Sequence, residues 1–158
     1  MAKQQPIEIF MPPNMLKAKM GGHAIGLDMA AVKRAEMAME DLKAEFTDWM
    51  NADVERLGQC RNAYAAKLDV ETKGDLYRAS HDVKGQAVTF EFPFAARIAS
   101  SLCKMLDAQG LAPLKLVDAH VDAIRVVVSR NIKDPHDPIS IALAKELETR
   151  VAELLATA

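Results

Sequence analysis

The sequence predicts an all-α protein, and three observations support this fold class. Half of the 158 residues are hydrophobic but only 5% are aromatic, a balance that favours helices. Apolar residues recur at spacings of three and four, which is the period of an amphipathic helix, and no segment has a competing strand pattern. Because short loops make successive helices antiparallel, we expect an up-and-down antiparallel four-helix bundle with additional flanking N- and C-terminal helices.

Residues 1–27 are expected to form a tail, extended or disordered, ahead of a single helical domain at 28–157. Proline and glycine interrupt this segment too often for a helix. Its apolar residues are numerous enough to pack onto a surface. A disordered tail and a tail that lies along the domain are therefore equal alternatives.

The first helical stretch covers residues 28–68, where apolar residues recur from Val32 to Leu68. Polar residues near Asn51 can cap a fresh start, so the sequence leaves open whether this stretch is one helix or two. After a polar turn, a second amphipathic pattern predicts a helix over roughly 72–89.

Three further helices are expected, at 93–109, from Pro113 to about 132, and at 139–156. Proline suits the first turn of a helix, which places starts at Pro93 and Pro113. Gly110 is a natural C-terminal stop. Asp137 and Pro138 form a good pair of N-cap and first-turn residues for the last helix.

Composition excludes several classes of function and location. The net charge of −2 does not suggest binding to nucleic acid or to an anionic membrane. No stretch of about 18 apolar residues is present, and the N-terminus lacks a signal-peptide pattern, so we expect a cytoplasmic protein without a membrane span. Cys60 and Cys103 form no CxxC motif and are interpreted as small buried hydrophobes of a reducing compartment.

No metal or cofactor site is expected, because the four histidines and two cysteines show no zinc spacing. His23 lies in the glycine-rich tail and His136 in a proline-rich connector, where a turn explains it. His120 is next to the core position Val121, so a partly buried helix histidine is the preferred interpretation.

The most informative stretch contains His81, Lys84 and Gly85, in the pattern His-x-x-Lys-Gly on the helix expected at 72–89. A helical wheel advances about 100° per residue, and on it the apolar residues cluster within roughly 40° of the pole opposite His81. These residues are Leu76, Ala79, Val83, Ala87 and Phe90. His81 is therefore predicted to face solvent.

The neighbours of His81 suit a phosphorylated histidine. A neutral imidazole nitrogen is a competent nucleophile, and phosphorylation would place close to two negative charges on the helix. Lys84 lies one turn away and can stabilise this charge, with Arg78 as a second cation on the other side. Gly85 costs helix stability, which is explained if another protein approaches there. Tyr77 and Val88 would supply contacts to that partner.

The stretch from Leu76 to Phe90 resembles the signature of histidine-containing phosphotransfer (HPt) domains, helical bundles that relay phosphoryl groups between receiver domains of two-component pathways. The resemblance implies that His81 is phosphorylated, that Lys84 stabilises the phosphoryl group and that Gly85 gives access. The family often has a glycine where this chain has Glu91.

The resemblance further implies a monomeric phosphoryl carrier whose partners are response-regulator receiver domains and a hybrid histidine kinase. No glycine-rich nucleotide loop or Walker motif is present, so we expect no autokinase activity. Two alternatives stay open. One is a non-catalytic helical adaptor that binds a signalling protein through the His81 face, and the other is an enzyme with His81 as general base. Asp82 is no acid/base partner for His81, because adjacent helix residues diverge.

Overall fold

The computed structural model describes residues 29–157, and for Lys43 and Ala44 it describes only the backbone. The tail expected at 1–27 lies outside the described residues. Contacts divide the chain into two compact units, Met1–Met39 and Glu40–Ala158. The described part of the first unit is helical. The second unit contains His81, Lys84 and Gly85.

The described residues are all-helical, as predicted, and contain no strand. The helices are α2 (Met29–Ala66), α3 (Val70–Thr89), α4 (Pro93–Asp107), α5 (Leu114–Ser129) and α6 (Pro138–Ala156). The question left open for 28–68 is settled, since α2 is one helix without a break near Asn51. None of these helices is both long and apolar enough to cross a membrane.

Aspartate side chains cap the starts of α3 and α6. The sequence predicts the cap at Asp137, but at Asp69 it predicts a polar turn with the helix beginning at about residue 72, whereas α3 begins at Val70. The Asp69 carboxylate accepts a hydrogen bond from the Thr72 backbone N–H at 2.9 Å and so caps α3. Asp137 caps α6 in the same way through the Ser140 N–H at 2.7 Å. The Lys67 ammonium and Thr72 hold the pKa of the Asp69 carboxyl down at about 2. The cap of the helix that carries His81 is therefore ionised across the physiological range.

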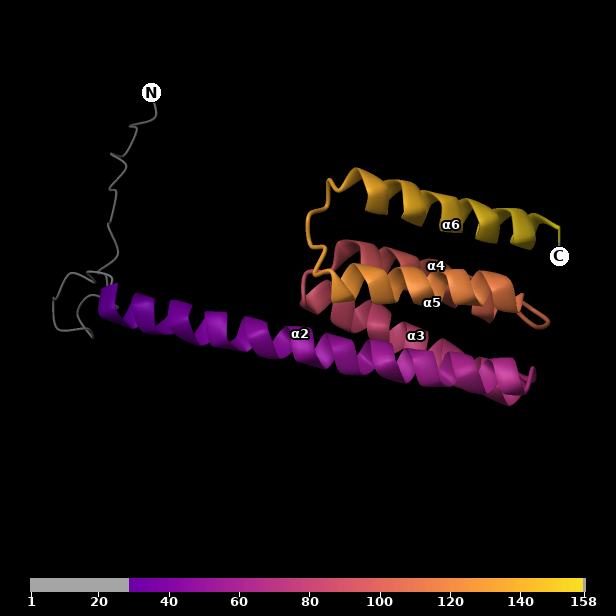
Figure 1. The fold of residues 1–158 in the computed structure, drawn as a ribbon, viewed down its shortest axis with the longest axis horizontal. Helices are drawn as coiled ribbons and strands as arrows, with labels where there is room; N and C mark the ends of the chain where they lie inside the picture. The colour runs from indigo at the N-terminus through magenta and orange to yellow at the C-terminus, as the bar shows by residue number, and fades with distance from the viewer. Residues whose placement is uncertain (1–28, 158) are drawn as a thin grey trace, which may run out of the picture. The chain divides into compact units, whose positions relative to one another are not determined.

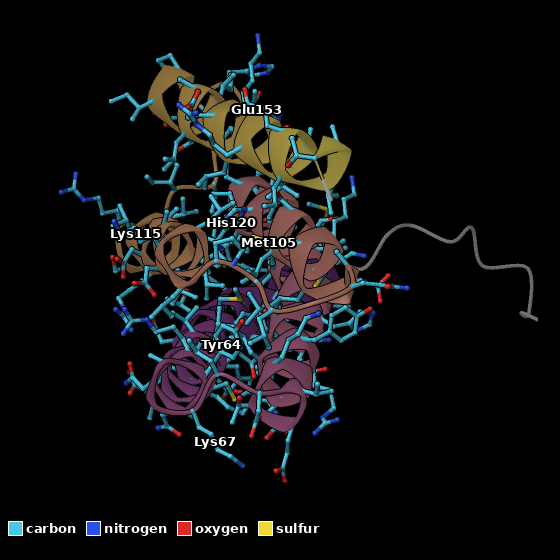
Figure 2. All side chains as sticks on the ribbon, turned by 90° about the vertical axis from the view of Figure 1, so that its right-hand side faces the viewer. Tyr64, Lys67, Met105, Lys115, His120 and Glu153 are labelled. Atoms are coloured by element: carbon cyan, nitrogen blue, oxygen red, sulfur yellow. The ribbon has the colours of Figure 1, made fainter. Side chains whose placement is uncertain are left out.

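α4 occupies the middle of the second unit, because it contacts α3, α5 and α6 (Figure 1). α2 is tied to α3 by the ion pair Arg56–Asp82 and to α5 by Arg61–Asp118. Figure 2 shows Tyr64, Met105 and His120 pointing into the space between the helices. Tyr64 is fully buried, and its hydroxyl donates a hydrogen bond to the Ala112 carbonyl at 2.8 Å. This bond fixes α2 to the loop that precedes α5.

The C-terminal end of α3 closes in a Schellman motif. The backbone N–H of Glu91 bonds to the Val88 carbonyl, and that of Phe92 bonds to the Ala87 carbonyl at 2.8 Å. This motif needs a left-handed residue after the cap, and Glu91 takes that conformation with φ 62°. For a residue with a Cβ this conformation costs about 1–2 kcal/mol. Glu91 thus takes a conformation that a glycine would adopt at this position without strain.

Phe90 and Phe92 anchor this turn on both sides. The Phe90 ring stacks on Phe46 of α2, with 4.8 Å between the ring centroids. Phe92 is fully buried and carries the Lys133 ammonium 4.7 Å above its ring centroid. The turn from α3 to α4 is therefore held against both α2 and the connector between α5 and α6.

Candidate functional site

His81 lies on the exposed face of α3, as the wheel predicts. All five residues of the expected core stripe are buried, none with more than 5% of its surface exposed. The His81 side chain is exposed, and within residues 29–157 its ring nitrogens form no hydrogen bond. Its contact is with Tyr77 one turn earlier, whose ring centroid lies 6.3 Å away at an interplanar angle of 30°. Both ring nitrogens are thus open to a reaction partner.

Lys84 is half-buried and also lacks an ion pair or hydrogen bond with any residue of the described part. Its ammonium is close enough to Cys103 of α4 to oppose the effect of burial, which raises the pKa of that thiol. The Lys84 charge therefore lies near α4 and has no ion-pair partner within residues 29–157. An incoming dianion beside His81 would meet this charge without first breaking an internal ion pair.

Gly85 borders open space. A Cβ added there would meet no atom within 4 Å outside its own helical neighbourhood, and the residue does not adopt a positive φ. Neither packing against residues 29–157 nor the backbone conformation therefore requires glycine at this position. The cost of glycine in a helix interior remains unexplained by the fold itself.

The other predicted contact residues differ in exposure. Val88 is 69% exposed and continues the face two turns beyond His81. Tyr77 is half-buried and packs against the core, so only part of its side chain is accessible to a partner. Arg78 is exposed and forms an ion pair with Asp75 on its own helix. Such exposed pairs are weak, so Arg78 can exchange partners at little cost.

Asp82 is directed away from His81, in agreement with the sequence. Its carboxylate accepts a hydrogen bond from Arg56 of α2 at 2.5 Å. No group of three or more histidine, cysteine, aspartate or glutamate side chains suited to a metal ion occurs among the described residues. The site thus consists of the exposed His81, the Lys84 ammonium and the open space beside Gly85. It is not a set of converging acid/base groups.

His120 is the most buried histidine of the described part, with no exposed surface, whereas the sequence indicates partial burial. Its Nδ1 lies 2.7 Å from the Leu116 carbonyl and its Nε2 lies 3.1 Å from the Ser101 Oγ. A carbonyl only accepts, so Nδ1 carries the proton and Nε2 accepts from the Ser101 hydroxyl. Burial lowers the pKa of His120. The hydrogen bond between His120 and Ser101 joins α5 to α4, which gives both buried side chains a structural role.

The remaining histidine and cysteine predictions have mixed outcomes. His136 is exposed and lies in a turn, where its backbone N–H donates to the Asp134 carboxylate at 2.9 Å, as expected of a connector. Cys103 is buried, as predicted, but Cys60 is only half-buried. Burial still raises the pKa of the Cys60 thiol. His23 lies outside the described residues.

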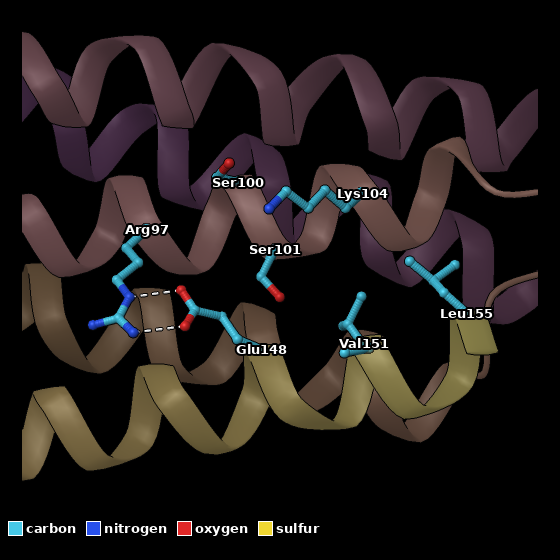
Figure 3. Close-up of a pocket in the computed structure, with 8 residues that line it drawn as sticks. Arg97, Ser100, Ser101, Lys104, Glu148, Val151 and Leu155 are labelled. Atoms are coloured by element: carbon cyan, nitrogen blue, oxygen red, sulfur yellow. Dashed lines mark hydrogen bonds and ion pairs between the residues drawn. The ribbon is translucent and has the colours of Figure 1, made fainter.

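A groove of about 440 Å³ lies between α4 and α6 (Figure 3). At one end Arg97 binds Glu148 through two hydrogen bonds of 2.6 Å, so both charges are already paired. Val151 and Leu155 line the other end. Ser101 lies between the two ends, and its hydroxyl donates a hydrogen bond to His120. At this groove α4 and α6 are held together by the Arg97–Glu148 ion pair. The sequence gives no signal for this pairing, because it depends on where α6 packs.

Comparisons with protein-family models, with curated proteins and with solved structures found no match.

Proposed function

We propose that the chain is a histidine phosphotransfer protein that relays a phosphoryl group between aspartates of receiver domains. The observation that carries this proposal is the composition of the α3 surface. An exposed histidine with free ring nitrogens stands one turn from an uncompensated lysine and from a glycine that the fold does not need. Each of the three is explained by transfer of a phosphoryl group to His81 from a docked protein.

The transfer follows from these positions. A neutral ring nitrogen of His81 attacks the phosphorus of an aspartyl phosphate on a receiver domain. A bond forms between nitrogen and phosphorus, the bond between phosphorus and the carboxylate oxygen breaks, and the receiver regains a free carboxylate. The proton on the other ring nitrogen exchanges with solvent. In the next step the carboxylate of a second receiver attacks the phosphorus, and His81 leaves as the neutral ring.

Lys84 and Gly85 have distinct roles in this proposal. The Lys84 ammonium balances the dianion on His81 through a charge-assisted hydrogen bond. Gly85 leaves room for the receiver backbone to approach, and Tyr77, Arg78 and Val88 form the surrounding docking face. Any magnesium belongs to the receiver, and the chain acts as a carrier without autokinase activity.

The proposal includes the finer architecture and the setting. The ion pairs of α2 with α3 and α5, and the contacts of α4 with α3 and α5, support an antiparallel four-helix bundle of α2 to α5 with α6 as a flanking helix. We propose that the protein acts as a monomer in the cytoplasm, downstream of a hybrid histidine kinase and together with response regulators.

The test is incubation with ³²P-labelled phospho-receivers encoded by the same genome. We expect label on the chain that is stable in alkali and labile in acid, as a phosphoramidate bond requires, and loss of that label in His81→Gln. Circular dichroism verifies that the variant keeps its helices. If receivers bind the chain through the His81 face without transfer, the adaptor alternative replaces the relay. If His81→Gln is labelled as well as the wild type, the site is wrong.

A further inference from the structure

A second groove begins where the proposed docking face ends. It encloses about 530 Å³ and is bordered by the end of α3, the α3–α4 turn, the start of α4 and the connector between α5 and α6. Val88, Phe92, Pro93, Ala96 and Pro135 provide apolar walls, while Glu91 and Lys133 are the charged residues at its rim. We call it the turn groove.

The turn groove is continuous with the surface around His81 through Val88. Val88 lines the groove and lies three residues after Gly85, on the next turn of the same helix face. With 69% of its surface exposed, it is among the largest uncovered apolar contacts on α3. A protein that reaches His81 across Gly85 and covers Val88 is therefore at the mouth of the turn groove.

The two charged residues at the rim differ in their contacts within residues 29–157. Glu91 forms no ion pair within residues 29–157, although it lines the same groove as Lys133. Lys133 instead rests over the Phe92 ring. Glu91 also holds a left-handed conformation that glycine would adopt without strain. A residue that costs stability and finds no partner in the described part of its own chain is explained by a partner in another chain.

We infer that the turn groove is the part of the receiver docking surface that determines which receiver binds. Its occupant is a receiver segment that places an apolar side chain between Val88 and Ala96 and a basic side chain opposite Glu91. This inference rests on the proposed function and goes beyond it. The surface at His81 serves every receiver alike, whereas the turn groove distinguishes a receiver with a cation at this point from one without.

The test compares two phosphoryl donors on the same variants. Phosphoramidate is too small to span the distance to the turn groove, so it reports on the His81 imidazole alone. Phosphorylated receivers from the same genome report on the imidazole together with docking. The measured quantity is the ratio of the receiver rate to the phosphoramidate rate, which removes any general change at His81.

We expect Glu91→Lys to lower this ratio about 10-fold or more for the receiver that transfers fastest, and Glu91→Gln about 3- to 5-fold, because a rim charge acts mainly on the association rate. Both effects should shrink in 0.5 M salt. Ala96→Leu fills the apolar part and should lower the ratio at all salt concentrations. Glu91→Gly should raise the melting temperature while it lowers the ratio, which separates strain from recognition.

Asp107→Lys is the matched control, since Asp107 is an exposed carboxylate at the opposite end of α4 and should leave the ratio unchanged. If the ratio stays within 2-fold of wild type in both Glu91→Lys and Ala96→Leu, the inference is wrong while the relay stands. The same holds if the wild type dimerises through this groove and the variants do not. If neither donor labels His81, the proposed function itself fails and the inference falls with it.

Discussion

Substitution of Gly85 by alanine separates the stability of α3 from its function. Gly85 lies inside α3 and has no positive φ, and outside its own helical neighbourhood an added Cβ would meet no atom of residues 29–157 within 4 Å. Alanine is favoured over glycine in a helix interior by roughly 1 kcal/mol. Gly85→Ala should therefore stabilise the protein by about this amount and raise its melting temperature by about 3 °C.

The same methyl group should impair transfer. If a receiver packs closely against Gly85, an extra methyl overpacks the interface at a cost of about 1–3 kcal/mol. A change of about 1.4 kcal/mol is tenfold, so transfer from a phospho-receiver should slow about 5- to 150-fold. Stability and activity are thus predicted to move in opposite directions for a single methyl group.

The assay pairs thermal unfolding by circular dichroism with receiver transfer kinetics. Gly74→Ala is the matched control on the same helix, because its Cβ would make only an ordinary contact, 3.9 Å from the Arg78 guanidinium. Seven residues place it about 10 Å along α3 from His81. It should show the gain in stability without the loss of transfer. A stabilised Gly85→Ala protein that transfers at the wild-type rate would refute the access role of Gly85.

Substitutions at three further positions probe α3, α2 and α5. Lys84→Ala should slow transfer or shorten the phosphohistidine lifetime about 10- to 150-fold, because a hydrogen bond to a charged group contributes about 1.5–3 kcal/mol. Lys84→Arg should be nearer to wild type, and equal lifetimes in Lys84→Ala and wild type would remove Lys84 from the mechanism. Tyr64→Phe should lower the free energy of unfolding in urea by about 1–2 kcal/mol by orphaning the buried Ala112 carbonyl, and an unchanged midpoint would contradict this. Burial holds the pKa of His120 below 6.5, so the unfolded chain protonates first and stability should fall as pH drops below about 6.5, by at most about 1.4 kcal/mol per pH unit. His120→Gln should flatten that profile, and an equally steep profile would assign it to other groups.

The arrangement of α3 was predictable because burial on a helix is periodic. The apolar residues from Leu76 to Phe90 share one face, and this alone places His81 in solvent. The start of α6 was predictable for a different reason. Asp137 caps the backbone N–H only three residues away, so sequence neighbours suffice. Asp69 caps α3 in the same way, but the sequence predicts a polar turn there.

Other features depend on residues far apart in the sequence. The full burial of His120 requires Ser101, which is 19 residues earlier on another helix. The half-exposure of Cys60 likewise depends on how α2 and α3 pack. The continuity of α2 past Asn51 shows that polar residues able to cap a helix do not break it where the backbone hydrogen bonds continue.

Glu91 combines a feature that sequence neighbours show with one that depends on packing. Its departure from the glycine of the HPt pattern is visible in the sequence, but the sequence does not say whether the turn changes with it. In the structure Glu91 adopts the strained left-handed conformation, because packing holds Phe90 and Phe92 on either side of it. A local preference is overruled here by packing of the flanking aromatic residues.

The most direct test of the relay uses two receivers in sequence. A first receiver carrying ³²P-aspartyl phosphate is mixed with the chain, freed of excess donor, and then given a second, unlabelled receiver. The proposal predicts that label reaches the aspartate of the second receiver only when wild-type chain is present, with His81→Gln giving none. Two results would contradict a relay through His81. One is label that passes between the receivers equally well with His81→Gln, and the other is label that stays on the first receiver for every pair of receivers.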